Sequence, residues 1–182
     1  MAKKRIALRP QVSSDDVDGA AWELDWPIVA TLAKTEDRPK QDVYRGDEDD
    51  TRVYLIHDDV LQLRYLIIDG PSADKVAKAA QGKLDTISVS DAEQLFDAAD
   101  SADDRATATL LLGVASDHGK VSATLKTAAT DDAKAVRRAA VIALGLVETA
   151  AAKDLLAKIS EDDEDEVVRG DAEATLKELG GA

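Results

Sequence analysis

The sequence contains no cysteine and only two histidines among its 182 residues. Without cysteine the chain cannot form disulfides, thiolate nucleophiles, or zinc and iron–sulfur sites held by sulfur. No apolar run approaches the roughly 20 residues that cross a bilayer. Residues 6–8 are apolar but are followed at once by Arg9 and Pro10, so the amino end lacks the apolar segment of a secretion signal. We therefore expect a cytoplasmic protein without membrane insertion.

Recognised catalytic motifs are also missing. The chain has no Gly-rich phosphate loop, no Gly-x-Ser-x-Gly elbow and no His-Glu-x-x-His helix. His57 precedes two aspartates, but a strand followed by a tight turn would point these side chains in different directions, and no second histidine lies at ligand spacing. His118 is expected in a polar turn between helices. We predict no metal, no cofactor and no enzymatic activity.

Basic residues are the minority, with 23 Lys and Arg against 37 Asp and Glu, which gives a formal net charge of −14. This sign disfavours nucleic acid and anionic membranes as partners, because both are bound mainly through Lys and Arg. Aspartate outnumbers glutamate by 27 to 10, and alanine occurs 32 times. Short carboxylates over a small-residue core are typical of proteins from halophiles. The 13 lysines against 10 arginines depart from that pattern.

The spacing of apolar residues changes near residues 88–101, which indicates a boundary between two parts of the chain. Before this stretch helical and alternating patterns are mixed, and after it the period is helical throughout. We predict an α+β cap domain at 1–90 and helical repeats at 91–182. Residues 15–34 have helical spacing, interrupted by Pro27, which predicts two short helices or one kinked helix. Trp22 and Trp26 would share one face and anchor a core, with a docking surface as the alternative.

Three strand-like segments follow, rich in Val, Ile, Tyr and Leu, at residues 42–45, 51–57 and 61–69. The short polar connections between them predict a three-stranded antiparallel meander. Gly70 and Pro71 end the last strand, and a helix is expected at 72–83. Both faces of the middle strand are partly apolar, so helices could cover one face and a partner the other.

The carboxyl-terminal half repeats itself every 32 residues, which indicates a stacked helical array. The anchor of the repeat is an arginine, at Arg105, Arg137 and Arg169. Small and apolar residues recur at the same offset, namely Ala108, Ala140 and Ala172, then Leu112, Leu144 and Leu176, and Gly113 with Gly145. The predicted copies are residues 103–130, 131–161 and 162–182.

Residues 131–145, with an acidic start, Val-Arg, Ala-Ala and Ala-Leu-Gly, resemble the HEAT-repeat family, in particular the HEAT-like repeats named after phycobilisome lyases. The resemblance implies a short α-solenoid that serves mainly as a protein-binding scaffold. It also implies that Arg105, Arg137 and Arg169 are structural and pair with nearby carboxylates. The expected acceptors are Asp131, Asp132, Asp162 and Asp163. The first copy departs from the pattern at Asp104, where valine is usual, and the third lacks the glycine.

A short array must be closed at its ends. The segment 91–99 is predicted to form a helix that seals the first repeat and joins it to the cap domain. Its predicted start is the capping box from Ser90 to Glu93, and Leu95 and Phe96 are expected to face inward.

The leading functional hypothesis is a non-catalytic protein–protein interaction module. It would be an accessory subunit or assembly factor docking on a larger partner, such as a multi-subunit enzyme. The candidate contact residues are Tyr54, Tyr65, Lys134, Arg138 and Val141. An alternative is an acidic inhibitor, immunity protein or nucleic-acid mimic, suggested by the acidic segments 47–50 and 161–166, which otherwise read as solvated turns. A third hypothesis, a lyase-like or chaperone-like factor for a cofactor protein, rests on the family name alone.

Overall fold

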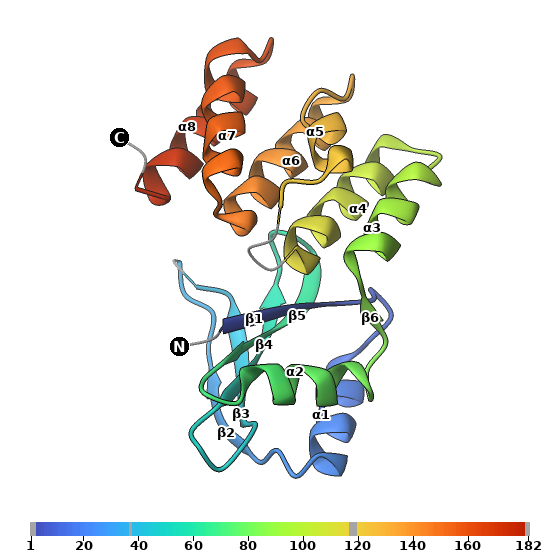
Figure 1. Cartoon of the computed structure of the whole chain (residues 1–182), viewed down its shortest axis with the longest axis vertical. Coiled ribbons are helices and arrows are strands. Elements are labelled where there is room, and N and C mark those ends of the chain that lie inside the picture. The colour runs from blue at the N-terminus through green and yellow to red at the C-terminus, as the bar shows by residue number, and fades with distance from the viewer. Residues whose placement is uncertain (1–2, 37, 117–119, 181–182) are drawn as a thin grey trace. The chain divides into compact units, whose positions relative to one another are not determined.

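The structure is a computed structural model that describes residues 3–36, 38–116 and 120–180. The chain forms two compact units, Met1–Ile87 and Ser88–Ala182. All strands among the described residues lie in the first unit, and the second is built from helices (Figure 1). This confirms the predicted α+β fold with a mostly helical carboxyl-terminal part.

The first unit contains one antiparallel sheet in the order β2-β3-β4-β5-β1-β6. The predicted meander corresponds to β3, β4 and β5, which are neighbours in that order. The structure adds β1, which pairs with β5, as well as the edge strands β2 and β6. The elements are β1 (Lys3–Leu8), α1 (Ser14–Glu23), β2 (Ile28–Leu32), β3 (Lys40–Arg45), β4 (Arg52–Asp58), β5 (Leu63–Asp69), α2 (Ala73–Gln81) and β6 (Thr86–Ile87).

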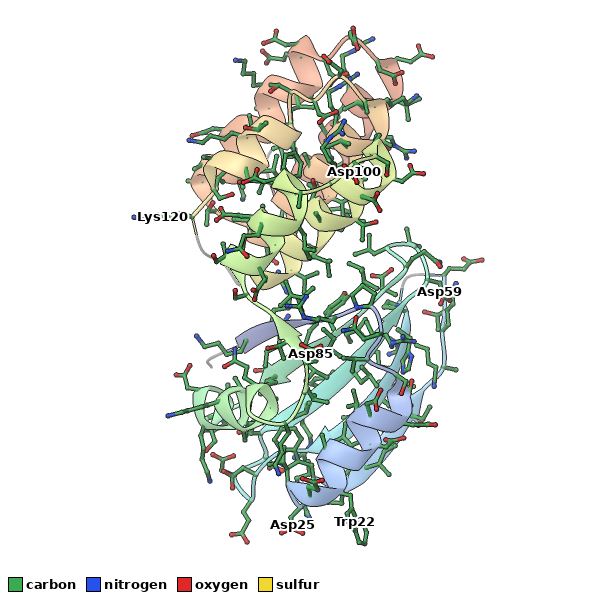
Figure 2. All side chains as sticks on the ribbon, turned by 90° about the vertical axis from the view of Figure 1, so that its right-hand side faces the viewer. Trp22, Asp25, Asp59, Asp85, Asp100 and Lys120 are labelled. Atoms are coloured by element: carbon green, nitrogen blue, oxygen red, sulfur yellow. The ribbon has the colours of Figure 1, made fainter. Side chains whose placement is uncertain are left out.

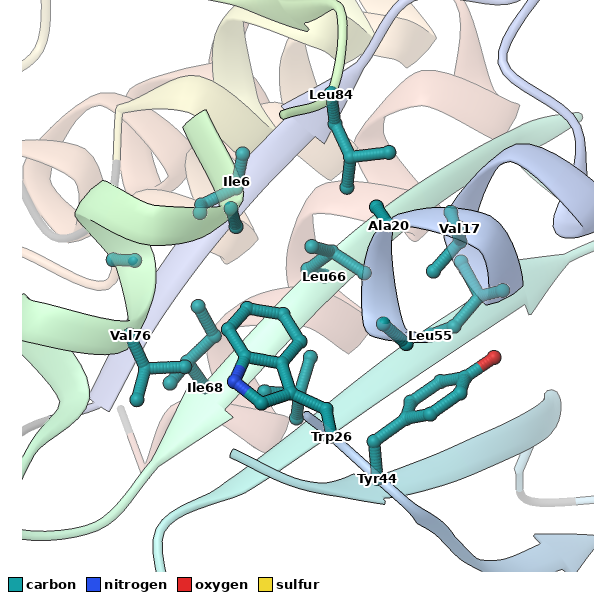
Figure 3. Packing of buried hydrophobic residues seen from close by; sticks show 14 of the residues in the cluster. Ile6, Val17, Ala20, Trp26, Tyr44, Leu55, Leu66, Ile68, Val76 and Leu84 are labelled. Carbon is teal, nitrogen blue, oxygen red and sulfur yellow. The ribbon is translucent and has the colours of Figure 1, made fainter. Parts of the chain in front are cut away.

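The core of this unit lies between one face of the sheet and the helices α1 and α2. Alternate strand residues point into it, as the two-residue period of a strand requires. Trp26 is buried in this core, with its indole ring beside Ile68 (Figure 3). The strands contribute Ile6, Leu8, Tyr44, Val53, Leu55, Leu66 and Ile68, and the helices contribute Val17, Ala20, Ala21, Ala73, Val76, Ala77 and Ala80.

The predicted helical character of residues 28–34 is wrong. Helix α1 ends at Glu23, and the chain turns through Asp25, whose φ of 56° is left-handed. Pro27 cannot donate a helical hydrogen bond, and its carbonyl instead accepts one from the backbone N–H of Arg45 at 3.0 Å. This contact leads into the pairing of β2 with β3. The turn also separates the two tryptophans: Trp22 is 87% exposed (Figure 2), and only Trp26 joins the core (Figure 3).

The second unit stacks the arginine-bearing helices side by side, α4 against α6 and α6 against α8. Helices α5 and α7 are the second helices of the repeats, and α3 packs against α4. The elements are α3 (Val89–Asp97), α4 (Ala102–Ala115), α5 (Ala123–Ala128), α6 (Lys134–Val147), α7 (Ala150–Asp162) and α8 (Glu166–Glu178).

The repeating glycines mark where neighbouring repeats approach most closely. A Cβ atom on Gly113 would lie 2.6 Å from the Cα of Ala143, and one on Gly145 would lie 2.8 Å from the Cγ2 of Thr175. Each glycine thus faces a residue 30 positions later. A close approach at the same repeat position therefore joins α4 to α6 through backbone and α6 to α8 through a side-chain methyl group, which favours glycine at this position of the repeat.

Helix α3 begins two residues before the predicted start. Its capping box is formed by Ser88 and Asp91, with the serine hydroxyl accepting from the backbone N–H of Asp91 at 3.1 Å. The side chain of Asp91 in turn accepts the backbone N–H of Ser88 at 2.9 Å, so the capping box lies two residues earlier than the predicted one at Ser90. Phe96 is buried as expected, whereas Leu95 is exposed.

Candidate interaction surface of the helical unit

Two arginines connect successive repeats through paired hydrogen bonds. Arg105 on α4 donates from Nε and Nη2 to the carboxylate of Asp131 at 2.8 and 3.0 Å. Arg137 on α6 makes the same two contacts with Asp163, at 2.9 and 3.2 Å. Each arginine reaches a carboxylate 26 residues later, at the start of the next repeat. This two-pronged geometry is the strongest form of the arginine–carboxylate contact.

The pair of Arg137 with Asp163 is the more enclosed of the two. Its side chains are 7% and 5% exposed, against 28% and 11% for Arg105 and Asp131. Arg137 also donates from Nη1 to the carbonyl oxygens of Asp131 and Asp132, at 3.0 and 3.1 Å. All three nitrogens of its guanidinium therefore donate hydrogen bonds, and it couples α6 to the turn that precedes α6 and to the turn that precedes α8.

Asp131 and Asp163, which accept from these arginines, also accept a backbone hydrogen bond within their own turns. One carboxylate oxygen of Asp131 accepts the backbone N–H of Ala133 at 2.8 Å, and Asp163 accepts that of Asp165 at 2.9 Å. Such Asx turns position the carboxylate before the following helix begins. The hydrogen bond from Arg105 lowers the pKa of Asp131, with the Ala133 N–H adding to it, and these effects outweigh the opposing effect of burial.

The third arginine repeats only the backbone contact. Arg169 donates from Nη1 to the carbonyl of Asp163 at 2.6 Å, which matches the contact of Arg137 with Asp131 32 residues earlier. No carboxylate among the described residues forms an ion pair with it.

The cations expected to face a partner also connect repeats. Lys134 Nζ lies 2.9 Å from a carboxylate oxygen of Asp165, and Arg138 donates to Asp171 at 2.6 Å. The Lys134 and Arg138 side chains remain 44% and 48% exposed. Val141 is fully buried in the helical unit and offers no surface to a partner. Of the α6 candidates, only Lys134 and Arg138 therefore remain accessible.

The two candidate tyrosines lie on neighbouring central strands of the sheet, Tyr54 on β4 and Tyr65 on β5. They belong to the face opposite the one covered by α1 and α2, because Val53, Leu55 and Leu66 point into the core. Tyr54 is partly exposed and Tyr65 is 7% exposed. Burial, with Asp58 nearby, raises the pKa of Tyr65 to about 12.

The acidic segment 47–50 is tied to the fold of the first unit. Asp47 pairs with Lys75 at 2.6 Å, and Asp50 pairs with Arg52 at 2.8 Å. Asp49 accepts hydrogen bonds from the hydroxyls of Ser72 and Thr51 at 2.6 and 2.7 Å. These carboxylates hold the turn between β3 and β4 against the start of α2.

His57 on β4 joins a small polar cluster. Its Nε2 lies 2.6 Å from Asp42, whose carboxylate also accepts from Thr31 at 2.9 Å and pairs with Lys40 at 3.1 Å. Burial raises the pKa of Asp42, but these three partners together outweigh it and lower the pKa. The part of the chain that the structure describes holds no group of three side chains suited to a metal. His118 lies outside the described residues.

The helical unit contains a cleft of about 340 Å³ beside α7. One wall is a face of α7 that carries Leu155, Lys158, Ile159 and Asp162, spaced three and four residues apart. The other walls come from the loops before α6 and before α8. The remaining lining residues are Ala129, Thr130, Asp131, Asp132, Arg137, Asp163 and Glu164. Sequence reasoning did not single out Leu155 or Lys158, although their spacing on α7 was the available signal.

Comparison with known proteins bears on this unit alone. A family model for HEAT repeats matches residues 90–177. No curated protein and no solved structure shows significant similarity to the chain. Among the described helices, none combines the length and apolar character needed to span a membrane. The 32-residue period, the stacked helices and the family match agree that residues 90–177 are built from HEAT repeats.

Proposed function

We propose that the protein is a non-catalytic interaction module whose HEAT repeats dock on a larger protein, as an accessory subunit or assembly factor. The observation that carries the proposal is the HEAT-repeat match over residues 90–177, since HEAT repeats generally mediate protein–protein interaction. A stacked array offers an extended surface rather than a closed pocket for a reaction. Residues 3–87 would then support or extend this surface.

The use of charge within the chain favours docking over mimicry of nucleic acid. A mimic needs carboxylates that face solvent and are available to a basic target. In the segment 47–50, the side chains of Asp47 and Asp49 are instead engaged by partners of the same unit, while Asp50 pairs with Arg52 but stays 86% exposed. In the segment 161–166, Asp163 and Asp165 are engaged by Arg137 and Lys134, whereas the other four carboxylates are exposed. The acidic surface that remains would supply solubility and steering more than affinity.

Affinity purification of the tagged full chain from its native source tests the proposal. We expect a partner at fixed stoichiometry that stays bound at about 1 M salt, where the screening length is only about 3 Å. A chain that elutes alone under every gentle condition would contradict the docking role. A partner that is basic and dissociates steeply with salt would instead support the acidic inhibitor.

A further inference from the structure

The cleft beside α7 combines an apolar floor with an acidic rim. Its floor includes Leu155, Ile159 and Ala129, of which the last two are buried. Its rim carries carboxylates from two loops that belong to successive repeats. With a volume of about 340 Å³, the cleft is large enough for one long side chain and its flanking backbone.

The fold neutralises only part of the charge in this cleft. Five carboxylates and two cations line it. Asp131 and Asp163 are held by Arg105 and Arg137. Glu164 also lies 3.1 Å from Arg137, but its side chain is 82% exposed.

The side chains of Asp132 and Asp162 have no hydrogen-bond or ion-pair partner among the described residues. Lys158, the second cation of the cleft, likewise makes no ion pair within those residues. Against this one cation stand Asp132, Asp162 and the exposed Glu164, so the mouth keeps an excess of negative charge. A ligand that brings positive charge to Asp132 and Asp162 would balance it.

We propose that this cleft receives a lysine or arginine side chain from the docking partner. The aliphatic stem would lie on Leu155 and Ile159, and the charged end would lie between Asp132 and Asp162. A long side chain with an apolar stem and a cationic tip matches both the floor and the rim. Among the described lining residues, an anionic ligand would meet one unpaired cation, Lys158, against the two unpaired carboxylates of Asp132 and Asp162. The inference rests on the proposed docking function and adds the chemistry of the residue that the repeats recognise.

A titration of the isotope-labelled full chain with a hexalysine peptide tests this assignment by NMR. We expect the amide shifts to cluster on the residues that line the cleft. The double variant Asp132→Asn and Asp162→Asn should weaken binding about fivefold, because two exposed ionic contacts are lost. Both residues are exposed, and their side chains make no hydrogen bond or ion pair with the described residues, so the fold should be kept, which a melting curve verifies.

The matched control is the double variant Asp154→Asn and Glu173→Gln, which removes the same charge at exposed positions of α7 and α8 outside the cleft. It should bind hexalysine as the parent chain does. Equal weakening in both double variants, or shifts scattered over the acidic surface, would overturn the assignment, since binding would then follow net charge alone.

The role of the floor is tested with a peptide of six diaminopropionic acid residues, which carries the same charges on shorter stems. We expect it to bind more weakly than hexalysine, and equal binding would contradict contact with Leu155 and Ile159. Failure here is distinct from failure of the proposed function. If a native partner stays bound but hexalysine does not bind in the cleft, only this inference is contradicted. If the chain has no partner at all, the docking role itself is contradicted.

Discussion

Arg137 is the residue whose loss should most weaken the contact between repeats. Replacing it with alanine leaves the carboxylate of Asp163 buried without its cation, and removing one partner of such a buried pair costs about 3–5 kcal/mol. The matched variant Arg105→Ala breaks a pair whose side chains are already more exposed to solvent. The loss of stability should therefore be smaller than for Arg137→Ala. Urea unfolding followed by circular dichroism measures both. Equal losses would contradict a special role for the enclosed pair.

Asp131 should make the helical unit sensitive to acid. Its pKa is lowered in the folded chain, so its carboxylate binds protons less readily there than in the unfolded chain. The stability it contributes is fully present above the unfolded pKa, near 3.8, and is lost as the pH falls through the lower folded pKa.

The variant Asp131→Asn isolates this contribution. Its melting temperature should lie below that of the parent chain at neutral pH, and the difference should shrink as the pH is lowered past about 4. Thermal melts between neutral pH and about pH 2.5 provide the comparison. A difference that stays constant over this range would show that Asp131 contributes nothing through its charge.

The sequence indicates the spacing of the repeat arginines but not the carboxylate each one meets. Several aspartates stand together at each repeat start, and their spacing to the arginine differs by only one residue. The structure selects Asp131 and Asp163, because each also accepts a backbone N–H two residues later and is thereby held in place. The engagement of Lys134 and Arg138 by Asp165 and Asp171 depends on how α6 meets α8, which is not a local property.

At the scale of elements, Gly113 is required by the packing of α4 on α6. An added Cβ would meet the backbone and the Cβ of Ala143, both at 2.6 Å, so neither neighbour can simply rotate away. The variant Gly113→Ala should lose about 1–3 kcal/mol of stability from this overpacking. Chemical denaturation of the full chain measures the loss.

Gly170 on α8 provides the opposite case. A Cβ there would meet no atom within 4 Å, and the position is helical. Gly170→Ala should therefore stabilise the chain by about 0.5–1 kcal/mol, because alanine loses less conformational freedom in a helix. The same sign of change in both variants would contradict the assignment of Gly113 to a close helix contact.

The local pattern of apolar residues identifies most helices and strands. It fails where pairing with a segment distant in the sequence determines the structure. The strands β3, β4 and β5 follow from their composition and short turns. Strand β1 starts with basic residues and is stabilised by β5, more than fifty residues away, so its local pattern is weak. Residues 28–32 have apolar spacing compatible with a helix, yet Pro27 and the pairing with β3 make them a strand.

At the scale of the whole molecule, the 32-residue helical period identifies the HEAT repeats. Residues 3–87 contain predictable strands but resemble no family identified from the sequence. The family match covers residues 90–177 and leaves the first unit outside it. The cleft beside α7 could not be located from sequence, because its walls come from loops of two successive repeats. Which of the many carboxylates remain unneutralised is also settled only by the packing of the helices.

Amine cross-linking of the native complex tests the docking role most directly, because lysines are spread over both units. The helical unit carries them at positions 120, 126, 134, 153, 158 and 177, and the first unit at 3, 4, 34, 40, 75, 78 and 83. We predict that cross-links to the partner map to the helical set, with Lys158 beside the cleft among them. Cross-links confined to residues 3–83, or their complete absence from a purified complex, would contradict the claim that the HEAT repeats form the docking surface.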